Sequence, residues 1–175
     1  MNIGDKLNNF ELKSANGISY TNYSFADRYA LCIVFMSNTC EISKAYWDRI
    51  FKLYGQYEED NMALIAINPN DDSLSPSDSI EEMKLFLESN NQLDFVYLKD
   101  SNHQITDELG AKVTPEVFLF NSKRELVYHG IIDDNWQNEN QVMMAYLEDA
   151  IEYCLDGIDI DYPEMPLEGC DIIRK

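Results

Sequence analysis

Almost continuous apolar runs alternate along the chain with segments in which apolar residues recur every three or four positions. The runs "YALCIVFM" at 29–36 and "MALIAI" at 62–67 are rich in strand-forming residues. A strand that is covered on both faces has this pattern. "DFVYL" at 94–98 predicts a third strand, and "EVFLF" and "ELVYH" predict two more on either side of the polar turn "NSKR". The core is therefore predicted to form around a sheet.

The first long helix is predicted directly after the first apolar run. From Glu41 onward, Ile42, Tyr46 and Ile50 recur at helical spacing, until the polar segment "GQYEED" interrupts the pattern. Because these apolar residues share one face, we expect that face to pack on the sheet and the opposite, charged face to be exposed to solvent.

Three further helices are predicted from periodicity and capping signals. In "SPSDSIEEMKLFLE", Asp78 is the expected N-cap, with Glu81 three residues later as in a capping box. A short helix in "SNHQITDELG" is expected to be capped by Ser101 and ended by Gly110. The last helix is expected to cover about residues 140–155, where apolar residues again recur at helical spacing.

The order of elements predicts an α/β fold. Strands and helices alternate as β-α-β-α-β-α-β-β-α, after a segment that can form a hairpin around "NGISY". Such alternation implies parallel strands flanked by helices, and the C-terminal hairpin adds antiparallel strands to a mixed central sheet. We expect one domain over residues 1–157, including an N-terminal extension, and a C-terminal strap over residues 158–175.

The charge balance narrows the class of partner. The 13 basic and 32 acidic residues give a formal net charge of −19. Nucleic acids and anionic membrane surfaces are therefore not expected as partners, because both bind to clustered Lys and Arg. The start "MNIGDKLNNF" lacks a signal-peptide pattern, and no segment approaches the roughly 20 apolar residues of a membrane span. A cytoplasmic location is expected.

The four cysteines differ in how well their positions suit a reactive thiol. Without an export signal they are expected to be reduced thiols. No two Cys or His residues lie at the short spacing of a zinc site, so neither a metal nor another cofactor is expected. Cys32 lies within the first strand and Cys154 on the apolar side of the last helix, where packing explains both. Cys40 and Cys170 remain as candidates.

Cys40, in the stretch "FMSNTCEISKAY", lies between the first strand and the first helix. Ligands tend to bind at this end of a central strand in α/β sheets. The free N–H groups and the dipole of a helix N-terminus favour a thiolate over a thiol. Lys44, one turn further on, would add positive charge, whereas the adjacent Glu41 opposes it. We expect a moderately lowered pKa for Cys40, the alternative being an inert buried cysteine.

Five ordered segments resemble the peroxiredoxin-like branch of the thioredoxin superfamily, often labelled redoxin or alkyl hydroperoxide reductase/thiol-specific antioxidant. They are "NTCEISKAYWDRI", "AINPNDD", "GAKVTPEVFLF", "LVYHGIIDDN" and a tail that ends in Gly-Cys. The resemblance spans nearly the whole chain and implies a thioredoxin-like fold for residues 1–157. In that superfamily a cis-proline loop faces the redox cysteine and pairs with an incoming peptide, which implies this role for Thr114 and Pro115.

The active segment departs from the pattern of many relatives, which read Cys-Asn-His-Cys-Pro. Here Ser37 replaces the first cysteine and Thr39 the histidine, so a disulfide within the segment is impossible. Ser-x-x-Cys resembles the Thr-x-x-Cys of true peroxiredoxins, in which a hydroxyl can bond the thiolate or a peroxide oxygen. Ser37, Asn38 and Thr39 are therefore expected to contact substrate.

Two other features of a peroxiredoxin are not found. Ile33 stands where that pattern places a proline, and no arginine that could polarise a peroxide is identified. Arg49 lies two to three turns along the first helix, and Arg124 falls in a turn that is expected to be remote. These departures weaken the case for an efficient peroxidase.

Cys170 is the candidate partner of Cys40. The 13 steps from Gly157 to Cys170 can span about 43 Å when extended, whereas a domain of this length has a radius of gyration of about 16 Å. The tail can therefore reach Cys40. A packed or merely exposed thiol at Cys170 is the alternative that the sequence leaves open.

Two functions follow from these observations. In the first, the chain is a thiol oxidoreductase whose Cys40 thiolate attacks a protein disulfide or a small hydroperoxide, and Cys170 or an external thiol reductant resolves the product. Ser37 and Lys44 would then stabilise the charged sulfur. In the second, the chain is a thioredoxin-fold binding module whose dithiol has decayed and whose proline groove holds a peptide without turnover.

Overall fold

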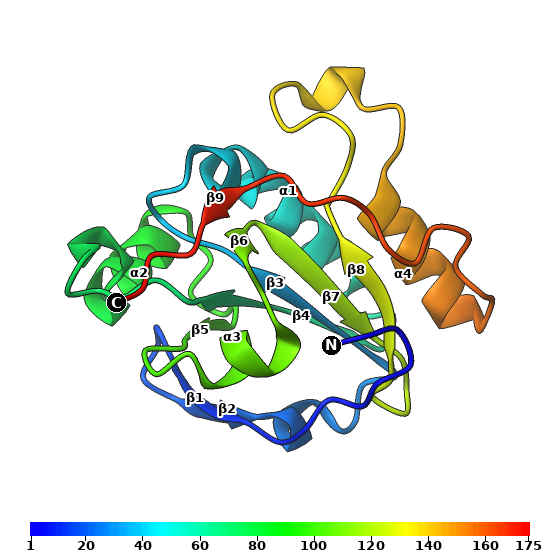
Figure 1. Ribbon diagram of the computed structural model, residues 1–175, viewed down its shortest axis with the longest axis horizontal. Helices are drawn as coiled ribbons and strands as arrows, with labels where there is room; N and C mark the ends of the chain where they lie inside the picture. Colours follow the sequence, from blue (N-terminus) through cyan, green and yellow to red (C-terminus); the bar gives the residue numbers. More distant parts are fainter.

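A mixed sheet of seven strands forms the centre of the computed structural model, which describes residues 1–175 (Figure 1). The strand order is β2-β1-β5-β4-β3-β7-β8, in which β3, β4 and β5 are parallel and the other neighbours antiparallel. The strands are β1 (Glu11–Ser14), β2 (Ser19–Thr21), β3 (Ala30–Phe35), β4 (Met62–Asn68), β5 (Tyr97–Lys99), β7 (Glu116–Phe120) and β8 (Leu126–Gly130). The predicted mixed α/β sheet and the N-terminal hairpin, β1–β2, are confirmed.

Strand β3 is apolar throughout because both of its faces lie in a core. Cys32 and Val34 belong to a cluster on one side of the sheet, and Leu31, Ile33 and Phe35 belong to a cluster on the other. Every residue of β3 is buried. The alternation of side chains across the sheet therefore explains a sequence pattern that shows no alternation of apolar and polar residues.

Helices cover both faces of the sheet. Apolar residues of α1 (Glu41–Tyr57), α2 (Ile80–Ser89) and α4 (Tyr146–Asp156) pack on one face. The short α3 (Gln104–Leu109) and the N-terminal segment pack on the other. None of the helices combines the length and the apolar character that a membrane crossing requires.

The predicted cap of α2 is wrong by one residue. The N-cap is Ser79, whose hydroxyl accepts a hydrogen bond from the N–H of Glu82 at 3.3 Å. Asp78 instead ends a short 3-10 helix, η2 (Pro76–Asp78), and its side chain is fully buried. The carboxylate of Asp78 does not cap α2 because it accepts hydrogen bonds from groups in other loops, among them the N–H of Asn38 and the hydroxyl of Thr39.

The start of α3 also differs from the prediction. Ser101 is exposed and caps nothing, and the helix begins at Gln104. The buried carboxylate of Asp100 accepts hydrogen bonds from the N–H groups of Gln104 at 2.9 Å and Thr106 at 2.8 Å. An aspartate at the end of β5 therefore satisfies the donors that the prediction assigned to Ser101.

The C-terminal strap, residues 158–175, crosses the sheet after α4. Helix α4 begins at Tyr146, later than predicted, because residues 139–141 form a separate 3-10 helix, η3 (Glu139–Gln141), and it ends at Gly157 as predicted. The strap, orange to red in Figure 1, forms a bridge with β8 through Glu164. It then adds β9 (Cys170–Asp171) antiparallel to β6 (Val113–Thr114). The chain end thereby reaches the edge of the sheet where β3 ends.

Candidate active site

Cys40 occupies the N-cap of α1, at the end of the short loop that follows β3. Its backbone is extended, with φ −69° and ψ 125°, and its N–H donates to the hydroxyl of Ser37 at 3.0 Å. The sulfur caps none of the N–H groups of the first helical turn. Its residue is only 4% exposed. The sulfur therefore lies beside the positive end of the helix, as predicted, but is turned toward another element.

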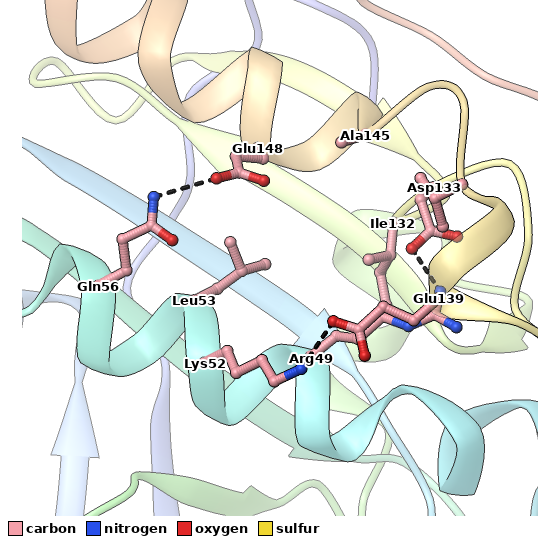
Figure 2. Close-up of a pocket in the computed structure, with 10 residues that line it drawn as sticks. Arg49, Lys52, Leu53, Gln56, Ile132, Asp133, Glu139, Ala145 and Glu148 are labelled. Atoms are coloured by element: carbon pink, nitrogen blue, oxygen red, sulfur yellow. Dashed lines mark hydrogen bonds and ion pairs between the residues drawn. The ribbon is translucent and has the colours of Figure 1, made fainter.

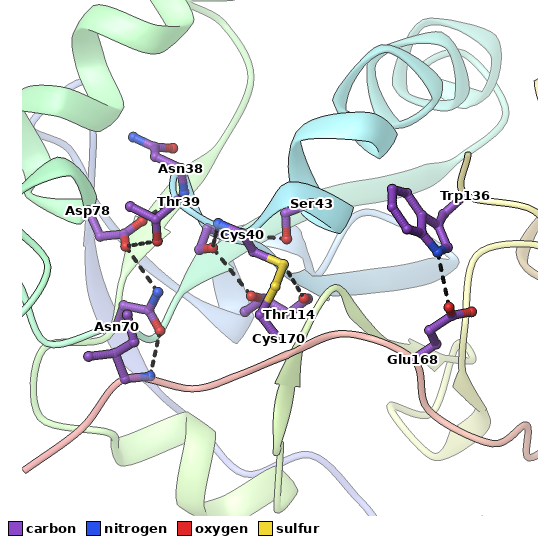
Figure 3. Close-up of a disulfide and its surroundings, with 12 residues drawn as sticks. Asn38, Thr39, Cys40, Ser43, Asn70, Asp78, Thr114, Trp136, Glu168 and Cys170 are labelled. Atoms are coloured by element: carbon purple, nitrogen blue, oxygen red, sulfur yellow. Dashed lines mark hydrogen bonds between the residues drawn. A yellow bond between two sulfur atoms is a disulfide. The ribbon is translucent and has the colours of Figure 1, made fainter. Parts of the chain in front are cut away.

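The sulfur of Cys40 is bonded to Cys170 (Figure 3). The two residues are 130 positions apart in the sequence, and their Cα atoms lie 5.8 Å apart. Such a Cα separation is usual for a disulfide. The structure therefore brings Cys170 to Cys40, and the alternative of an unconnected thiol at 170 does not describe this state. The two sulfurs are close enough in space for thiol–disulfide exchange between them.

The proline loop faces the same sulfur. The Thr114–Pro115 bond is cis, and the carbonyl oxygen of Thr114 lies 3.0 Å from Cys40 Sγ. The hydroxyl of Thr114 donates to that of Ser37 at 3.3 Å. In the pairing of β6 with β9, Thr114 lies opposite Cys170. Thr114, the residue before the cis-proline, thus adjoins both Cys40 and Cys170.

A buried carboxylate fixes the proline loop. Glu116, the residue after Pro115, is fully buried and accepts hydrogen bonds from the N–H groups of Lys112 at 2.7 Å and Val113 at 3.0 Å. Its other oxygen lies 2.7 Å from Nε2 of His129. Glu116 is not among the residues predicted from the sequence, although an acid that opens an apolar strand is a signal that could have pointed to it.

A second buried carboxylate fixes the loop before Cys40. Asp78 accepts hydrogen bonds from the N–H of Asn38 at 2.7 Å and from the hydroxyl of Thr39 at 2.8 Å (Figure 3). It also accepts bonds from Asn68 Nδ2, Asn70 Nδ2 and Ser75 Oγ, at 2.8, 3.0 and 2.6 Å respectively. Burial alone would raise the pKa of Asp78, but the hydrogen bonds outweigh it and leave the pKa below its usual value. Asp78 is therefore an anion at neutral pH.

Three other residues of the predicted site have these surroundings. The N–H of Asn38 and the hydroxyl of Thr39 donate to Asp78, and the side-chain amide of Asn38 donates to the carbonyl of Ser77 at 2.9 Å, so both residues hold the loop. Their contact with a substrate stays a prediction. Lys44 is exposed, and although its backbone N–H donates to the carbonyl of Cys40 at 2.9 Å, no hydrogen bond or ion pair joins its ammonium group to Cys40 or to the strap. Its four-carbon stem extends into solvent, so the structure gives no support to the expected effect of Lys44 on the sulfur.

Arg49 lines a separate cleft of about 290 Å³ between α1 and the segment that follows β8 (Figure 2). Its guanidinium pairs with the buried carboxylate of Asp133 at 2.5 Å and donates to the carbonyl of Asn135 at 2.8 Å. Arg124 donates to backbone carbonyls near the opposite end of β3, including that of Arg28 at 3.0 Å. The guanidinium groups of Arg49 and Arg124 therefore bind partners other than Cys40.

The two remaining cysteines are buried in the core, as predicted. Burial raises the pKa of Cys154 to about 11 and raises that of Cys32 still further. Thiols with such values are almost never ionised at neutral pH and are poor nucleophiles. No three His, Cys, Asp or Glu side chains come close enough together to hold a metal ion. Cys40 and Cys170 are therefore the two cysteines that lie at this site rather than in the core.

Comparison with known proteins gives one family match. A family model described as AhpC/TSA family matches residues 3–129. This segment includes Cys40 and the proline loop but not Cys170. None of the curated proteins gives a significant match to the chain.

Solved structures similar to the chain include two of nearly its full length. A hypothetical protein of Sinorhizobium meliloti is 32% identical, with a TM-score of 0.91 over 98% of this chain and 94% of that one. An uncharacterized conserved protein of Geobacillus kaustophilus is 26% identical, with a TM-score of 0.92 over 99% and 93%. A peroxidoxin of Mycobacterium tuberculosis, at 14% identity, has a TM-score of 0.62 over 89% and 95%. The likeness to the peroxidoxin shows that the fold is thioredoxin-like.

Proposed function

The chain belongs to the AhpC/TSA family, and from this premise we propose that it is a two-cysteine thiol oxidoreductase in which Cys40 attacks the substrate and Cys170 resolves the intermediate. The observation that supports this most directly is the Cys40–Cys170 disulfide beside the cis-proline loop. At this disulfide the N-terminus of helix α1, the backbone of the cis-proline loop and a second sulfur come together. A binding module without turnover would need only the backbone of the proline loop, to hold a peptide.

The proposed reaction is thiol–disulfide exchange. The Cys40 thiolate attacks one sulfur of a substrate disulfide, forms a mixed disulfide and releases the other substrate sulfur as a thiolate. The Cys170 thiolate then attacks Cys40 Sγ and releases the remaining substrate thiolate. Two protein thiols are oxidised to one disulfide, and one substrate disulfide is reduced to two thiols. An external thiol reductant, such as those of the cytoplasm, returns the protein to the dithiol.

Opposing groups at Cys40 set its reactivity. The α1 N-terminus favours the thiolate, whereas the Thr114 carbonyl oxygen at 3.0 Å favours a protonated thiol that can donate to it. We therefore propose a pKa moderately below the ordinary value of about 8.5. Opening of the short β9–β6 pairing after reduction, with the strap still anchored beyond it, would give a substrate access to the sulfur.

Reduction of a small hydroperoxide is the second candidate. The hydroxyl groups of Ser37 and Thr114 lie 3.3 Å apart next to Cys40, and they supply donors for a peroxide oxygen. In that reaction, the thiolate takes one peroxide oxygen to form a sulfenic acid, the alcohol leaves, and Cys170 displaces water to give the disulfide. We rank this second because Arg49 is bound to Asp133 and no other arginine adjoins the sulfur.

Alkylation of the reduced protein tests the proposal. Iodoacetamide modification, followed by peptide mass spectrometry from pH 5 to 10, should show Cys40 reacting with a midpoint below about 7.5. Cys32 and Cys154 are internal controls and should stay unmodified in the folded protein. In turnover with a small disulfide, C40S should be inactive and C170S should accumulate the mixed disulfide. A Cys40 midpoint at 8.5 or above, with no turnover, would leave the binding module as the better description.

A further inference from the structure

Beside the disulfide, the strap is held by a buried side chain, that of Asn70. The N–H of Ile173 donates to the side-chain oxygen of Asn70 at 2.9 Å, and the carbonyl of Ile173 accepts from the N–H of Asp71 at 2.8 Å. Asn70 is only 2% exposed. The bond from Trp136 to Glu168 and the ion pair of Arg174 are exposed, and exposed pairs contribute little.

The other end of the same amide is tied to the Cys40 loop. Asn70 Nδ2 donates to the Asp78 carboxylate at 3.0 Å, and that carboxylate accepts from Thr39, the residue before Cys40. Figure 3 shows the chain of contacts from Thr39 through Asp78 and Asn70 to the strap. Asn70 therefore links the backbone three residues after Cys170 to the loop that ends in Cys40.

Such a link matters most when the disulfide is open. The pairing of β9 with β6 involves only two residues of each strand, extended by a hydrogen bond from the N–H of Ile172 to the carbonyl of Lys112 at 3.1 Å. The bridge of the strap with β8 lies at Glu164, six residues before Cys170, so this short pairing and the Ile173 contacts are the backbone contacts nearest to Cys170 in the reduced state. The rate of an intramolecular attack depends strongly on how often the two sulfurs meet in the correct geometry. A buried hydrogen bond is worth more for this purpose than an exposed ion pair.

We propose that Asn70 is a positioning residue for the resolving step, because its amide sets the strap in register with the Cys40 loop. This rests on the proposed function, in which Cys170 attacks Cys40 Sγ. Asn70 touches neither sulfur. Its loss should therefore slow the attack by Cys170 and leave the first attack by Cys40 unchanged.

Dithiobis(nitrobenzoate), DTNB, separates the two steps in a stopped-flow experiment. The Cys40 thiolate attacks DTNB, forms a mixed disulfide and releases one coloured nitrothiobenzoate. Cys170 then attacks Cys40 Sγ, forms the Cys40–Cys170 disulfide and releases a second nitrothiobenzoate. Limiting DTNB and the C170S variant assign the first release to Cys40.

Two variants remove the hydrogen bond between Asn70 and Ile173, one from each partner. N70A removes the amide, and I173P removes the N–H that donates to it while the Asn70–Asp78 bond remains. Each should slow the second release about tenfold and change the first by less than twofold. The double variant should be no slower than the single ones, because both act on one contact. R174A, which removes an exposed ion pair of the strap, is the matched control and should leave both releases unchanged.

The possible outcomes separate this inference from the proposed function. If wild type gives both releases and neither N70A nor I173P slows the second, Asn70 does not position the strap. If N70A slows both releases and I173P slows neither, Asn70 supports the Cys40 loop only, and the inference is wrong. If wild type itself gives no second release, the resolving role of Cys170 fails first.

Discussion

Two buried aspartates, Asp78 and Asp100, lie at the edge of the sheet where β4 and β5 end. Asp78 accepts hydrogen bonds from neighbouring loops, and Asp100 accepts them from the first turn of α3. Asp78 is the acceptor of five hydrogen bonds. Hydrogen bonds to a charged group are stronger than those between neutral groups, and a buried carboxylate is tolerated only when it has such partners. A change of one atom at Asp78 is therefore expected to have a measurable cost.

We expect D78N to lower the free energy of unfolding at pH 7 by about 3 kcal/mol, because an amide presents a donor where the carboxylate accepts. The pKa of Asp78 is lowered in the folded protein, so its charge stabilises the fold above the unfolded pKa, near 4. That stabilisation is lost as the pH falls through the folded pKa. The difference between wild type and D78N should therefore shrink below pH 4, as measured by urea unfolding.

D72N is the matched control for this prediction. Asp72 is exposed in the same loop, and no hydrogen bond or ion pair involves its side chain. Its replacement should change the free energy of unfolding by less than about 0.5 kcal/mol. A difference between wild type and D78N that stays constant from pH 7 to pH 3 would contradict the role given to the charge.

At the scale of elements, the strap and the proline loop form a two-stranded ribbon that closes the site. Gly169 lies so close to β6 that a Cβ atom there would be 2.8 Å from the carbonyl oxygen of Thr114 and 2.9 Å from Val113 Cβ. Both contacts are shorter than atoms tolerate, and the oxygen belongs to rigid backbone. The Gly-Cys sequence of the tail is therefore required by the close approach of the two chains.

We expect G169A to weaken the pairing of β9 with β6 without unfolding the domain. The disulfide should then be easier to reduce, with an equilibrium constant against glutathione shifted about tenfold toward the dithiol, or about 30 mV. D171A, on the exposed side of β9, should leave that constant unchanged. Quenched alkylation and mass spectrometry of redox-buffered samples measure both, and equal constants for wild type and G169A would contradict the packing argument.

At the scale of the whole molecule, the net charge of −19 acts on every substrate that approaches the site. A field of this sign attracts cations and repels anions, and salt screens it over about 10 Å at 0.1 M. The net charge does not decide the fold, but it should make the protein react faster with cationic disulfides than with anionic ones of similar size.

Two small disulfides of matched length and opposite charge test this bias. Cystamine should react with the reduced protein faster as salt is lowered from 0.5 M to 0.02 M, and dithiodipropionate should react more slowly. The ratio of the two rate constants should change by about tenfold over that range. The reaction of each disulfide with free cysteine, measured under the same conditions, corrects for its intrinsic reactivity. A ratio of rate constants that does not change with salt would show that the net charge has no effect on the reaction at the site.

The pattern of apolar residues by itself determined most of the fold. Strands such as β3 were recognisable because a strand with two buried faces must be apolar throughout, and α1 because its buried face repeats at helical spacing. Local polar signals were less informative. Asp78 and Ser101 resemble N-caps in sequence, but whether a side chain caps a helix depends on which other donors lie near it in space.

The sequence by itself also singled out Cys40 and the Thr-Pro segment, because the reactivity of a thiol at a helix start depends on local chain geometry. Only the tertiary structure decided which sulfur meets Cys40, and that Asp78, Asn70 and Glu116 hold the segments around it. These contacts join residues dozens of positions apart, and a flexible tail can reach many places with similar loop entropy. Side-chain pairing across the folded sheet, which no local pattern encodes, selects one of those places.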